Sequence, residues 1–554
     1  MDTIVDVLAA HARRQPDALY TRFIDGDDGI TELSYGLVWA SARRWATHLR
    51  GAGLEPGQPV ILSLANEPAF VGAYFGALLA AAVPVPVAPV TKPDPADPRQ
   101  RMVAERLAFL GARHVVVAAG APAVADACLA VAPAGTVVLT PDGLPADGPG
   151  ADEAAATDPD ALGLIQFSSG TAGAAKAVEL TQRALLAQVR VLTAAIESDP
   201  ETDSALSWLP FFHDMGLIGF LLAPAYVGAS VTILRTESFL RNPRIWPRAI
   251  TRFGATVIGG PPSAFGLAAR FAREAERGEL DLSGVRVALV AAEAIEPPVL
   301  RSFARTFERS GLRYESLTPA YGLAENALAV TLSSLGAGFA VDVIDPVILQ
   351  QDGRAVPADG RAGREVTSVG RPVPETEVAI ADASGGHLEE RRVGEILVRS
   401  GSLMRGYRGQ TEPAIRDGWL STGDLGYVAD GELYITGRAK ELIIVGGANY
   451  FPDDLERQAG AVDGVRQGRA VAFSVDDPGR VGESVVVLVE TTLRDPARRA
   501  SLEQAVRRSL TAAGLPVNVV GLAPPRFIRS TDTGKVKRVE ARQRYLAGEL
   551  DGAS

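Results

Sequence analysis

Cysteine, histidine and lysine are all scarce in this chain of 554 residues. Its single cysteine, Cys128, excludes an internal disulfide framework and a cysteine-based metal site. The five histidines stand far apart, without the spacing of metal ligands. Acidic residues outnumber basic ones, and the formal net charge of −11 argues against nucleic-acid binding, which needs basic stripes. The first residues carry no signal-peptide pattern, so we expect a cytoplasmic protein.

Long apolar runs are also few, and the one at residues 70–90 raises the question of a membrane span. Three prolines in the second half of this run would break a spanning helix. A buried helix that runs into a strand near residue 83 accounts better for the pattern. We therefore expect no stable membrane insertion.

Hydrophobic residues make up 47% of the chain and charged residues 22%, which is typical of a globular protein with ample core. Between residues 59 and 330, short apolar runs alternate with helical patterns, which predicts a parallel sheet with both faces covered by helices. Beyond residue 330, short Val/Ile runs and the hairpin signal Asp430-Gly431 indicate a smaller β unit. The predicted fold class is therefore α/β.

The most informative stretch, SSGTAGAAK at 168–176, is rich in glycine and hydroxyl side chains. It follows a predicted buried strand at 162–167 and precedes a helical pattern that begins at Thr181. Small residues let backbone N–H groups surround an anion, and Lys176 adds a cation, so the natural ligand is a nucleotide triphosphate. The stretch lacks the Gly-Lys-Ser/Thr of a Walker loop. Taken alone, it could also be an ordinary Gly/Ser loop.

Two more polar clusters follow predicted strands, AAEAIEP from residue 291 and PAYGLAEN from residue 319. Ligands of parallel α/β sheets gather at the carboxyl ends of the strands. We therefore expect these clusters and the Gly-rich stretch to face one crevice.

The few lysines are unevenly placed. Only five of the 55 basic residues are lysines, and four of these, Lys176, Lys440, Lys535 and Lys537, lie in Gly-rich or turn-like segments. Because an ammonium group is a compact point charge, such positions suit contact with an anion.

Six ordered motifs resemble the adenylate-forming (acyl-activating) superfamily over essentially the whole chain. They are SSGTAGAAKAVELT, WLPFFHDMGLIG, PAYGLAEN, GWLSTGDLG, GRAKELIIVGGANYFPDDLE and STDTGKVKR. WLPFFHDMGLIG, YGLAEN and GANYFPDDLE are most similar to the fatty acyl-AMP ligases. The wide gap between Glu325 and Ser368 resembles an insertion of that branch, at about 331–368.

The resemblance implies how the chain is divided. A large N-terminal domain at 1–437 would contain two parallel α/β subdomains and a small β-barrel-like subdomain. A small, mobile α+β C-terminal domain at 438–554 would follow, with its hinge at Lys440.

The resemblance also implies a reaction. A fatty acid and ATP, with Mg²⁺, would give an acyl-adenylate and pyrophosphate, and the acyl group would then pass to a thiol. The insertion would hinder the domain rotation that admits coenzyme A, so the acceptor would be the phosphopantetheine arm of an acyl carrier protein. An acyl- or aryl-CoA ligase is the first alternative, and a non-catalytic adenylate-binding relative is the second.

Motif by motif, the resemblance assigns roles to individual residues, with Lys176, His213 and Lys535 as the catalytic set. The phosphates of ATP would contact Ser168, Ser169, Gly170, Thr171, Gly173 and Lys176. The adenine would lie against Ala292, Glu293, Tyr321 and Gly322, and the ribose against Asp424 and Arg438. Glu325 would hold Mg²⁺, Lys535 would bridge the acyl carboxylate and the α-phosphate, and His213 would lie between the acyl pocket and the phosphates.

Three of these assignments have structural alternatives. Arg438 could form a salt bridge with Asp424 or Glu441 instead of reaching the ribose. Glu325 could be an ordinary carboxylate at the start of a helix, and His213 could be a hydrogen-bonded structural histidine.

Two further features bear on the reaction. The chain departs from the family pattern at Ala172, Ala175, Ala177 and Asp532, and the lost hydroxyl at Ala172 removes one phosphate donor. The apolar, small-residue stretch at 211–229 indicates a lipid-sized tunnel.

Overall fold

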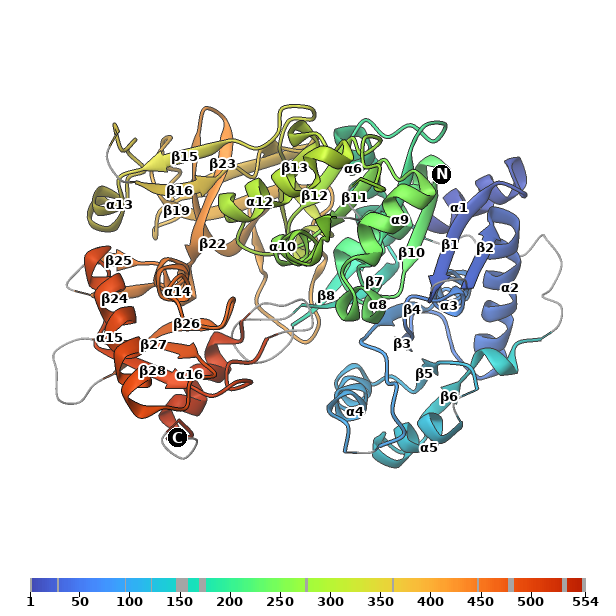
Figure 1. Cartoon of the computed structure of the whole chain (residues 1–554). Helices are drawn as coiled ribbons and strands as arrows, with labels where there is room; N and C mark the ends of the chain where they lie inside the picture. The colour runs from blue at the N-terminus through green and yellow to red at the C-terminus, as the bar shows by residue number, and fades with distance from the viewer. Residues whose placement is uncertain are drawn as a thin grey trace.

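The computed structural model describes residues 2–26, 29–94, 96–120, 122–145, 158–168, 176–274, 278–360, 363–445, 448–476, 483–530 and 536–550. Five expected site residues, Ser169, Gly170, Thr171, Gly173 and Lys535, lie outside these ranges. The N-terminal lobe (residues 59–145) and the C-terminal domain lie at opposite ends of a central part that carries the largest sheet (Figure 1).

The N-terminal lobe is built on a four-stranded parallel sheet of order β4-β3-β5-β6. Its elements are β3 (Pro59–Ser63), α3 (Pro68–Leu79), β4 (Val83–Pro86), α4 (Pro98–Leu110), β5 (His114–Val117), α5 (Pro122–Val131) and β6 (Val137–Leu139). All residues of β3, β4 and β5 are buried, as expected for parallel strands covered on both faces. The apolar run at 70–90 forms α3 and β4, as predicted. Among the described residues, no helix combines the length and apolarity that a bilayer span requires.

The central sheet has nine strands in the order β17-β14-β13-β12-β11-β9-β10-β1-β2, parallel from β13 to β1 and antiparallel at both edges. The strands are β1 (Leu19–Asp25), β2 (Gly29–Ser34), β9 (Ser204–Ser207), β10 (Ser230–Leu234), β11 (Val257–Gly260), β12 (Val287–Val290), β13 (Leu317–Gly322), β14 (Ala329–Leu332) and β17 (Arg371–Pro372). The helices around it are α1 (Ile4–Arg14), α2 (Tyr35–Gly51), α6 (Gln182–Ala195), α8 (Thr236–Arg241), α9 (Ile245–Phe253), α10 (Pro262–Phe271) and α12 (Pro297–Phe307). The first hairpin of the chain thus belongs to this sheet, because β1 pairs with β10 across about two hundred residues.

The apolar segment after β9 forms a π-helix, Met215–Leu222, that continues into α7 (Ala223–Val227). Asp214 caps its start by accepting a hydrogen bond from the Met215 N–H (2.7 Å). Most of its side chains are buried in the central core. π-Helices are rare and frequently mark functional sites. The lipid-sized tunnel at 211–229 remains a prediction.

A small antiparallel sheet carries the Gly-rich stretch between β7 (Leu162–Ser168) and β8 (Lys176–Thr181), so that Ser168 lies opposite Lys176. β20 (Gly406–Tyr407) pairs with the other edge of β8. The sequence predicts a strand, a loop and then a helix, and this prediction misses β8. The six residues of β8 become a strand because β7 and β20 bond to both of its edges, and β20 is distant in sequence.

The region at 331–438 contains the smaller β unit. Its five-stranded sheet consists of β18 (Thr376–Ala381), β19 (Gly394–Ser400), β21 (Ile415–Arg416), β22 (Trp419–Ala429) and β23 (Glu432–Arg438). The predicted hairpin is confirmed, since Asp430 and Gly431 join β22 and β23 with positive φ angles of 53° and 74°. The region of the expected insertion holds β15 (Val341–Ile344), α13 (Pro346–Asp352) and β16 (Arg364–Thr367), and β15 pairs with β16.

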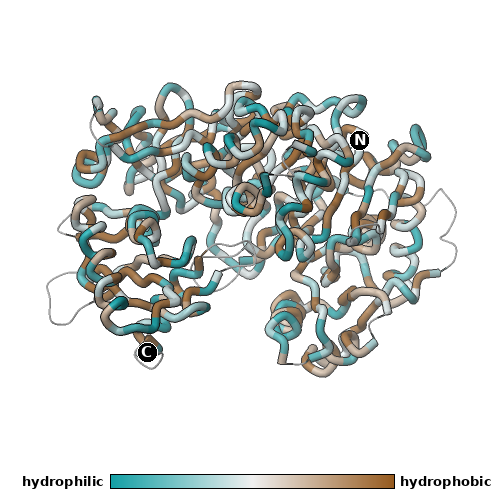
Figure 2. Tube along the Cα trace, viewed as in Figure 1, coloured by the Kyte–Doolittle hydropathy of each residue, from teal (hydrophilic) through white to brown (hydrophobic). Residues whose placement is uncertain are grey.

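The C-terminal domain has a sheet and a core of its own. Its elements are β24 (Ile443–Val445), β25 (Ala448–Tyr450), α14 (Pro452–Gly460), β26 (Ala470–Asp476), β27 (Glu483–Glu490), α15 (Pro496–Ala512), β28 (Val519–Ala523) and α16 (Arg538–Leu546). Hydrophobic strands fill its centre, as they do in the other parts of the molecule (Figure 2). The predicted α/β class, with a large N-terminal domain and a small α+β C-terminal domain, is confirmed.

Candidate active site

The carboxyl ends of β12 and β13 carry the expected adenine residues. Tyr321 and Gly322 lie inside β13, so the polar cluster begins within the strand rather than after it. A Cβ atom at Gly322 would stand 2.1 Å from the carbonyl oxygen of Leu328, which explains why only glycine fits this close pairing with β14. Ala292, just beyond β12, has a φ of 74°, a left-handed conformation that non-glycine residues rarely adopt.

Glu293 ties the end of β12 to the first turn of α10. Its carboxylate accepts hydrogen bonds from the hydroxyl (3.0 Å) and the backbone N–H (3.2 Å) of Ser263. The segment expected to line the adenine pocket is therefore held by the strand β12 and by the start of the helix α10.

Tyr321, Asp424 and Arg438 form one hydrogen-bonded group. The buried Tyr321 hydroxyl donates to Asp424 Oδ2 (2.6 Å), and Arg438 Nε lies 3.0 Å from Asp424 Oδ1. Burial, followed by the nearby Asp424 carboxylate, raises the pKa of Tyr321 well above its ordinary value. The salt bridge between Arg438 and Asp424 was an alternative to a ribose contact, and it is present. Each carboxylate oxygen can accept a second hydrogen bond, so the pair does not exclude sugar hydroxyls.

Lys176 and Glu325 are joined through a residue that the sequence analysis missed. The Lys176 ammonium lies 4.2 Å from the centre of the Tyr407 ring, and the Tyr407 hydroxyl donates to Glu325 Oε1 (2.8 Å). Burial and the Glu325 carboxylate raise the pKa of Tyr407, which keeps the hydroxyl protonated and able to donate. No periodic pattern marks Tyr407, because β20 has only two residues and its partner β8 is distant in sequence.

A buried carboxylate fixes the segment that holds Tyr407. Glu179, on β8, accepts from Arg405 (2.7 Å) and from Arg408 (3.0 Å), and the Met404 N–H donates to the Glu325 carbonyl (2.8 Å). Because Glu325 follows Tyr321 by four residues, the lysine cluster and the tyrosine–aspartate cluster adjoin.

His213 lies on a loop that the Gln166 side chain of β7 holds. Its Nδ1 is 2.7 Å from Asp214 Oδ1, and the carbonyl of the preceding residue, Phe212, accepts from Gln166 Nε2 (2.6 Å) on β7. The loop therefore lies beside the strand that enters the Gly-rich stretch, as its expected place beside the phosphates requires. Both readings of His213, catalytic and structural, remain compatible with these contacts.

The segment that follows Lys535 is anchored in the C-terminal domain. Arg538 forms ion pairs with Glu456 (2.9 Å), Asp453 (2.9 Å) and Glu441. Burial lowers the pKa of Arg538 to about 10, and burial raises that of Glu456. Lys440 is exposed in a short 3₁₀ turn, Ala439–Glu441, between the domains.

The residues present fit a magnesium ion held partly by phosphate. Mg²⁺ is usually bound by one or two carboxylates together with phosphate oxygens and water. Glu325 supplies one half-buried carboxylate, which Tyr407 links to Lys176 at the described end of the Gly-rich stretch. Among the described residues, no group of three or more His, Cys, Asp or Glu could hold a metal ion.

Comparison with known proteins agrees with this arrangement. The model of the AMP-binding enzyme family matches residues 8–408. The chain is 32% identical to a Caulobacter vibrioides protein named as an acyl-CoA synthetase, over 94% of this chain and 91% of that protein. It is 30% identical to the long-chain-fatty-acid–AMP ligase FadD32 of Mycolicibacterium smegmatis, over 98% and 95% of the two chains.

Solved structures give the same result. A structure from work on the fatty acyl-adenylate ligases of E. coli and L. pneumophila superposes with a TM-score of 0.89 at 32% identity, covering 99% of this chain and 98% of that one. The chain therefore belongs to the AMP-binding enzyme family, and it is a ligase whose resemblance to the fatty acyl-AMP ligases is confirmed.

Proposed function

We propose that this ligase joins a fatty acid to the α-phosphate of ATP, releases pyrophosphate, and passes the acyl group to the phosphopantetheine thiol of an acyl carrier protein. The observation that carries the proposal is the adjoining pair of clusters, Lys176–Tyr407–Glu325 and Tyr321–Asp424–Arg438. They join a cation beside the Gly-rich stretch to hydrogen-bond acceptors suited to a nucleoside. The relatives named as fatty-acid–AMP ligases support the choice of acid.

The chemistry needs positioning more than proton transfer. A carboxylate oxygen of the fatty acid attacks the α-phosphorus, and the bond from that phosphorus to the pyrophosphate oxygen breaks. A fatty acid is already ionised at neutral pH, so no general base is required. The protein has to hold nucleophile and leaving group in line and to offset the crowded negative charge.

Each cluster has a separate task in this proposal. Lys176 contacts the β- and γ-phosphates, and the Gly-rich stretch offers backbone N–H groups. Mg²⁺, held by Glu325, would neutralise charge on the phosphate oxygens. The adenine is lined by Tyr321, Ala292, Glu293 and Gly322. Asp424 accepts hydrogen bonds from the ribose hydroxyls, and Arg438 donates to them. His213 lies between the acid and the phosphates. Lys535 bridges the acyl carboxylate and the α-phosphate.

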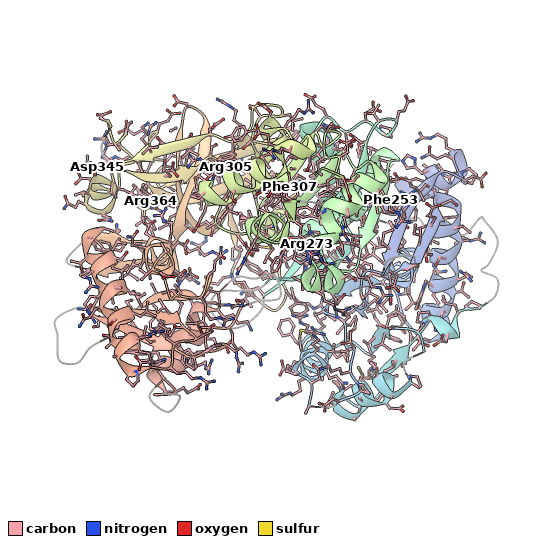
Figure 3. All side chains as sticks on the ribbon, in the orientation of Figure 1. Phe253, Arg273, Arg305, Phe307, Asp345 and Arg364 are labelled. Atoms are coloured by element: carbon pink, nitrogen blue, oxygen red, sulfur yellow. The ribbon has the colours of Figure 1, made fainter. Side chains whose placement is uncertain are left out.

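The choice of a carrier protein as acceptor is supported by a contact between the expected insertion and the C-terminal domain. Arg364, which is labelled in Figure 3, lies on β16. It forms a largely buried ion pair with Asp454 on α14 (3.0 Å) and covers the Phe451 ring at 4.8 Å. It also donates to the Thr436 carbonyl (3.0 Å). The contacts with Asp454 and Phe451 stabilise the observed pose of the C-terminal domain against the rotation expected about Lys440, which would hinder access by coenzyme A.

The proposal is tested by incubating the protein with ATP, Mg²⁺ and a panel of fatty acids, with holo-carrier protein or coenzyme A offered separately. We expect pyrophosphate and acyl-adenylate in both mixtures. Mass analysis should detect acyl thioester in the mixture with carrier protein and none in the mixture with coenzyme A. Acyl thioester that forms with coenzyme A but not with the carrier protein would support the acyl-CoA ligase alternative instead. Failure to release pyrophosphate with any acid would contradict the proposal as a whole.

Replacing Arg364 by alanine should allow coenzyme A to act as an acceptor. The variant loses a buried, charge-assisted contact, so the population of rotated domain should rise about tenfold. Acyl-CoA would be measured by mass spectrometry after a fixed number of adenylation turnovers.

The matched control is Arg301→Ala. It removes the exposed ion pair of Arg301 with Glu365 (2.9 Å), which joins the same insertion to α12 of the N-terminal domain. An equal gain of acyl-CoA in both variants, or none in Arg364→Ala, would argue against a restraining role of the Arg364 contact.

Tyr407→Phe should weaken the handling of Mg·ATP. The variant keeps the ring beside Lys176 and removes the hydroxyl that orients Glu325, so we expect the KM for ATP to rise about five- to tenfold. Steady-state pyrophosphate release gives this value. Tyr427→Phe is the control, because the Tyr427 hydroxyl donates to Asp342 (2.9 Å) away from the cluster. A similar change in both variants would contradict the proposed role of Tyr407.

A further inference from the structure

Glu325 lies in a tight turn between β13 and β14 whose backbone is strained. Within this turn the Leu328 N–H donates to the Asn326 carbonyl, only two residues earlier in the chain (2.6 Å). The bond closes a γ-turn at Ala327, which is fully buried and has a φ of 58° and a ψ of −51°. γ-Turns of this hand are rare and strained. Such a turn persists only where the surrounding structure holds it.

The side chain of Asn326 is one of the groups that hold the turn. It is fully buried, and its Nδ2 donates to the carbonyl of Ala329 (2.7 Å), the first residue of β14. Its Oδ1 accepts from the hydroxyl of Ser400, the last residue of β19. The same hydroxyl accepts from the Ser402 N–H (3.0 Å). Both ends of the Asn326 amide therefore have partners within the protein, and a satisfied polar network of this kind is rigid.

A second buried amide reaches the same turn from α6. Gln188 is fully buried, and in the amide orientation that satisfies its hydrogen bonds its Nε2 donates to the carbonyls of Asn326 (2.7 Å) and Ala329 (3.3 Å). The Asn326 carbonyl thus accepts both the γ-turn bond and the Gln188 bond. The turn is therefore held by α6 on one side and by β19 on the other.

This network joins elements that carry the residues assigned to the phosphates and the metal. α6 begins directly after β8, whose first residue is Lys176. The segment that follows Ser400 contains Met404, whose N–H donates to the Glu325 carbonyl (2.8 Å), and then Tyr407, which donates to the Glu325 carboxylate. Glu325 is thus fixed at its backbone, at its carboxylate and through the residue that follows it.

We propose that Asn326 is a positioning residue that sets the Glu325 carboxylate for Mg²⁺. The inference rests on the proposed function, in which Glu325 holds the ion together with phosphate oxygens. A carboxylate on a turn that could relax would have to be ordered when the ion binds, at a cost in binding free energy. The Asn326 side chain avoids this cost by fixing the turn beforehand, and it acts through Glu325 because its own polar atoms are bonded to protein groups.

The test measures ATP binding by calorimetry without fatty acid, once with Mg²⁺ and once with EDTA. The ratio of the two dissociation constants reports what the metal adds to nucleotide binding, and a general loss of the ATP site cancels from it. We expect wild-type protein to bind ATP more tightly with Mg²⁺. Asn326→Ala should reduce this advantage about tenfold, the scale on which partners of metal-binding residues affect metal affinity. Ser400→Ala should reduce it by a smaller factor, and it carries the test if Asn326→Ala does not fold.

A double variant shows whether Asn326 acts through Glu325. Glu325→Gln should itself remove most of the Mg²⁺ advantage, and adding Asn326→Ala should then cause no further loss, as for two residues that act as one unit. The matched control is Asn518→Ala. Its amide fixes a backbone segment of the C-terminal domain, where Asn518 Oδ1 accepts from the Val485 N–H (2.7 Å), so its loss should leave the ratio unchanged.

Three results would overturn the inference. They are an unchanged ratio in folded Asn326→Ala or Ser400→Ala, an equal fall in Asn518→Ala, and a further loss in the double variant as large as that in Asn326→Ala alone. If Glu325→Gln keeps the full Mg²⁺ advantage, the metal role of Glu325 in the proposed function is wrong and the inference fails with it. Wild-type protein that binds no ATP would contradict the proposed function itself.

Discussion

Lys535→Ala is expected to slow acyl-adenylate formation by about 100-fold or more, the scale found when a group that stabilises developing charge is removed. The substitution deletes the ammonium that, in the proposed reaction, touches both the attacking carboxylate and the α-phosphate. Acyl transfer from preformed adenylate should change much less, because in that step the thiol attacks the acyl carbon and the α-phosphorus is not attacked. Pyrophosphate release and single-turnover transfer measure the two steps separately.

Lys537→Ala is the matched control. Lys537 is two residues away, half-exposed, and 3.7 Å from Glu540, so its loss should leave the rate within about twofold, as for a surface ion pair. The described residues on either side of Lys535 are held by side-chain contacts, Ser530 with Arg469 and Arg538 with Glu456. Near-normal pyrophosphate release by Lys535→Ala would contradict the proposed role of Lys535 in adenylation.

Asp424→Ala is expected to lower kcat/KM for ATP by about 100-fold, through a raised KM. The substitution removes two proposed ribose contacts and leaves the Tyr321 hydroxyl and the Arg438 guanidinium without their partner, which together amount to about two charged hydrogen bonds. Steady-state pyrophosphate release at varied ATP concentration gives both constants.

The control for Asp424→Ala is Glu377→Ala, which breaks the exposed ion pair with Arg399 in the same sheet. Exposed pairs contribute little to stability, so this variant should behave as wild type. A comparable loss in both variants, or unfolding of Asp424→Ala in thermal melts, would show that Asp424 supports the sheet rather than the nucleotide.

Much of the fold follows from patterns within short windows. The alternation of buried strands and helices between residues 59 and 131, the hairpin at Asp430-Gly431 and the break of the apolar run by prolines all depend on local sequence, and all are confirmed. The pairing of β1 with β10 was not predictable, because strand partners distant in sequence leave no local signal.

The residues of the candidate site also fall into those that local motifs identify and those that they do not. The motifs predicted that Tyr321 and Asp424 belong to one site, and the two are hydrogen-bonded to each other from β13 and β22. Tyr407 was missed because its function depends on β20 folding against β8, a contact that no spacing reveals.

The central claim is that a fatty-acid carboxylate attacks the α-phosphate of ATP in this site. It is tested most directly by supplying a fatty acid labelled with ¹⁸O in its carboxyl group, together with ATP, Mg²⁺ and holo-carrier protein, and analysing the AMP by mass spectrometry. The account predicts AMP that carries one labelled oxygen, because the bridging oxygen stays on phosphorus when the thiol takes the acyl group. AMP without label, formed alongside acyl thioester, would contradict it.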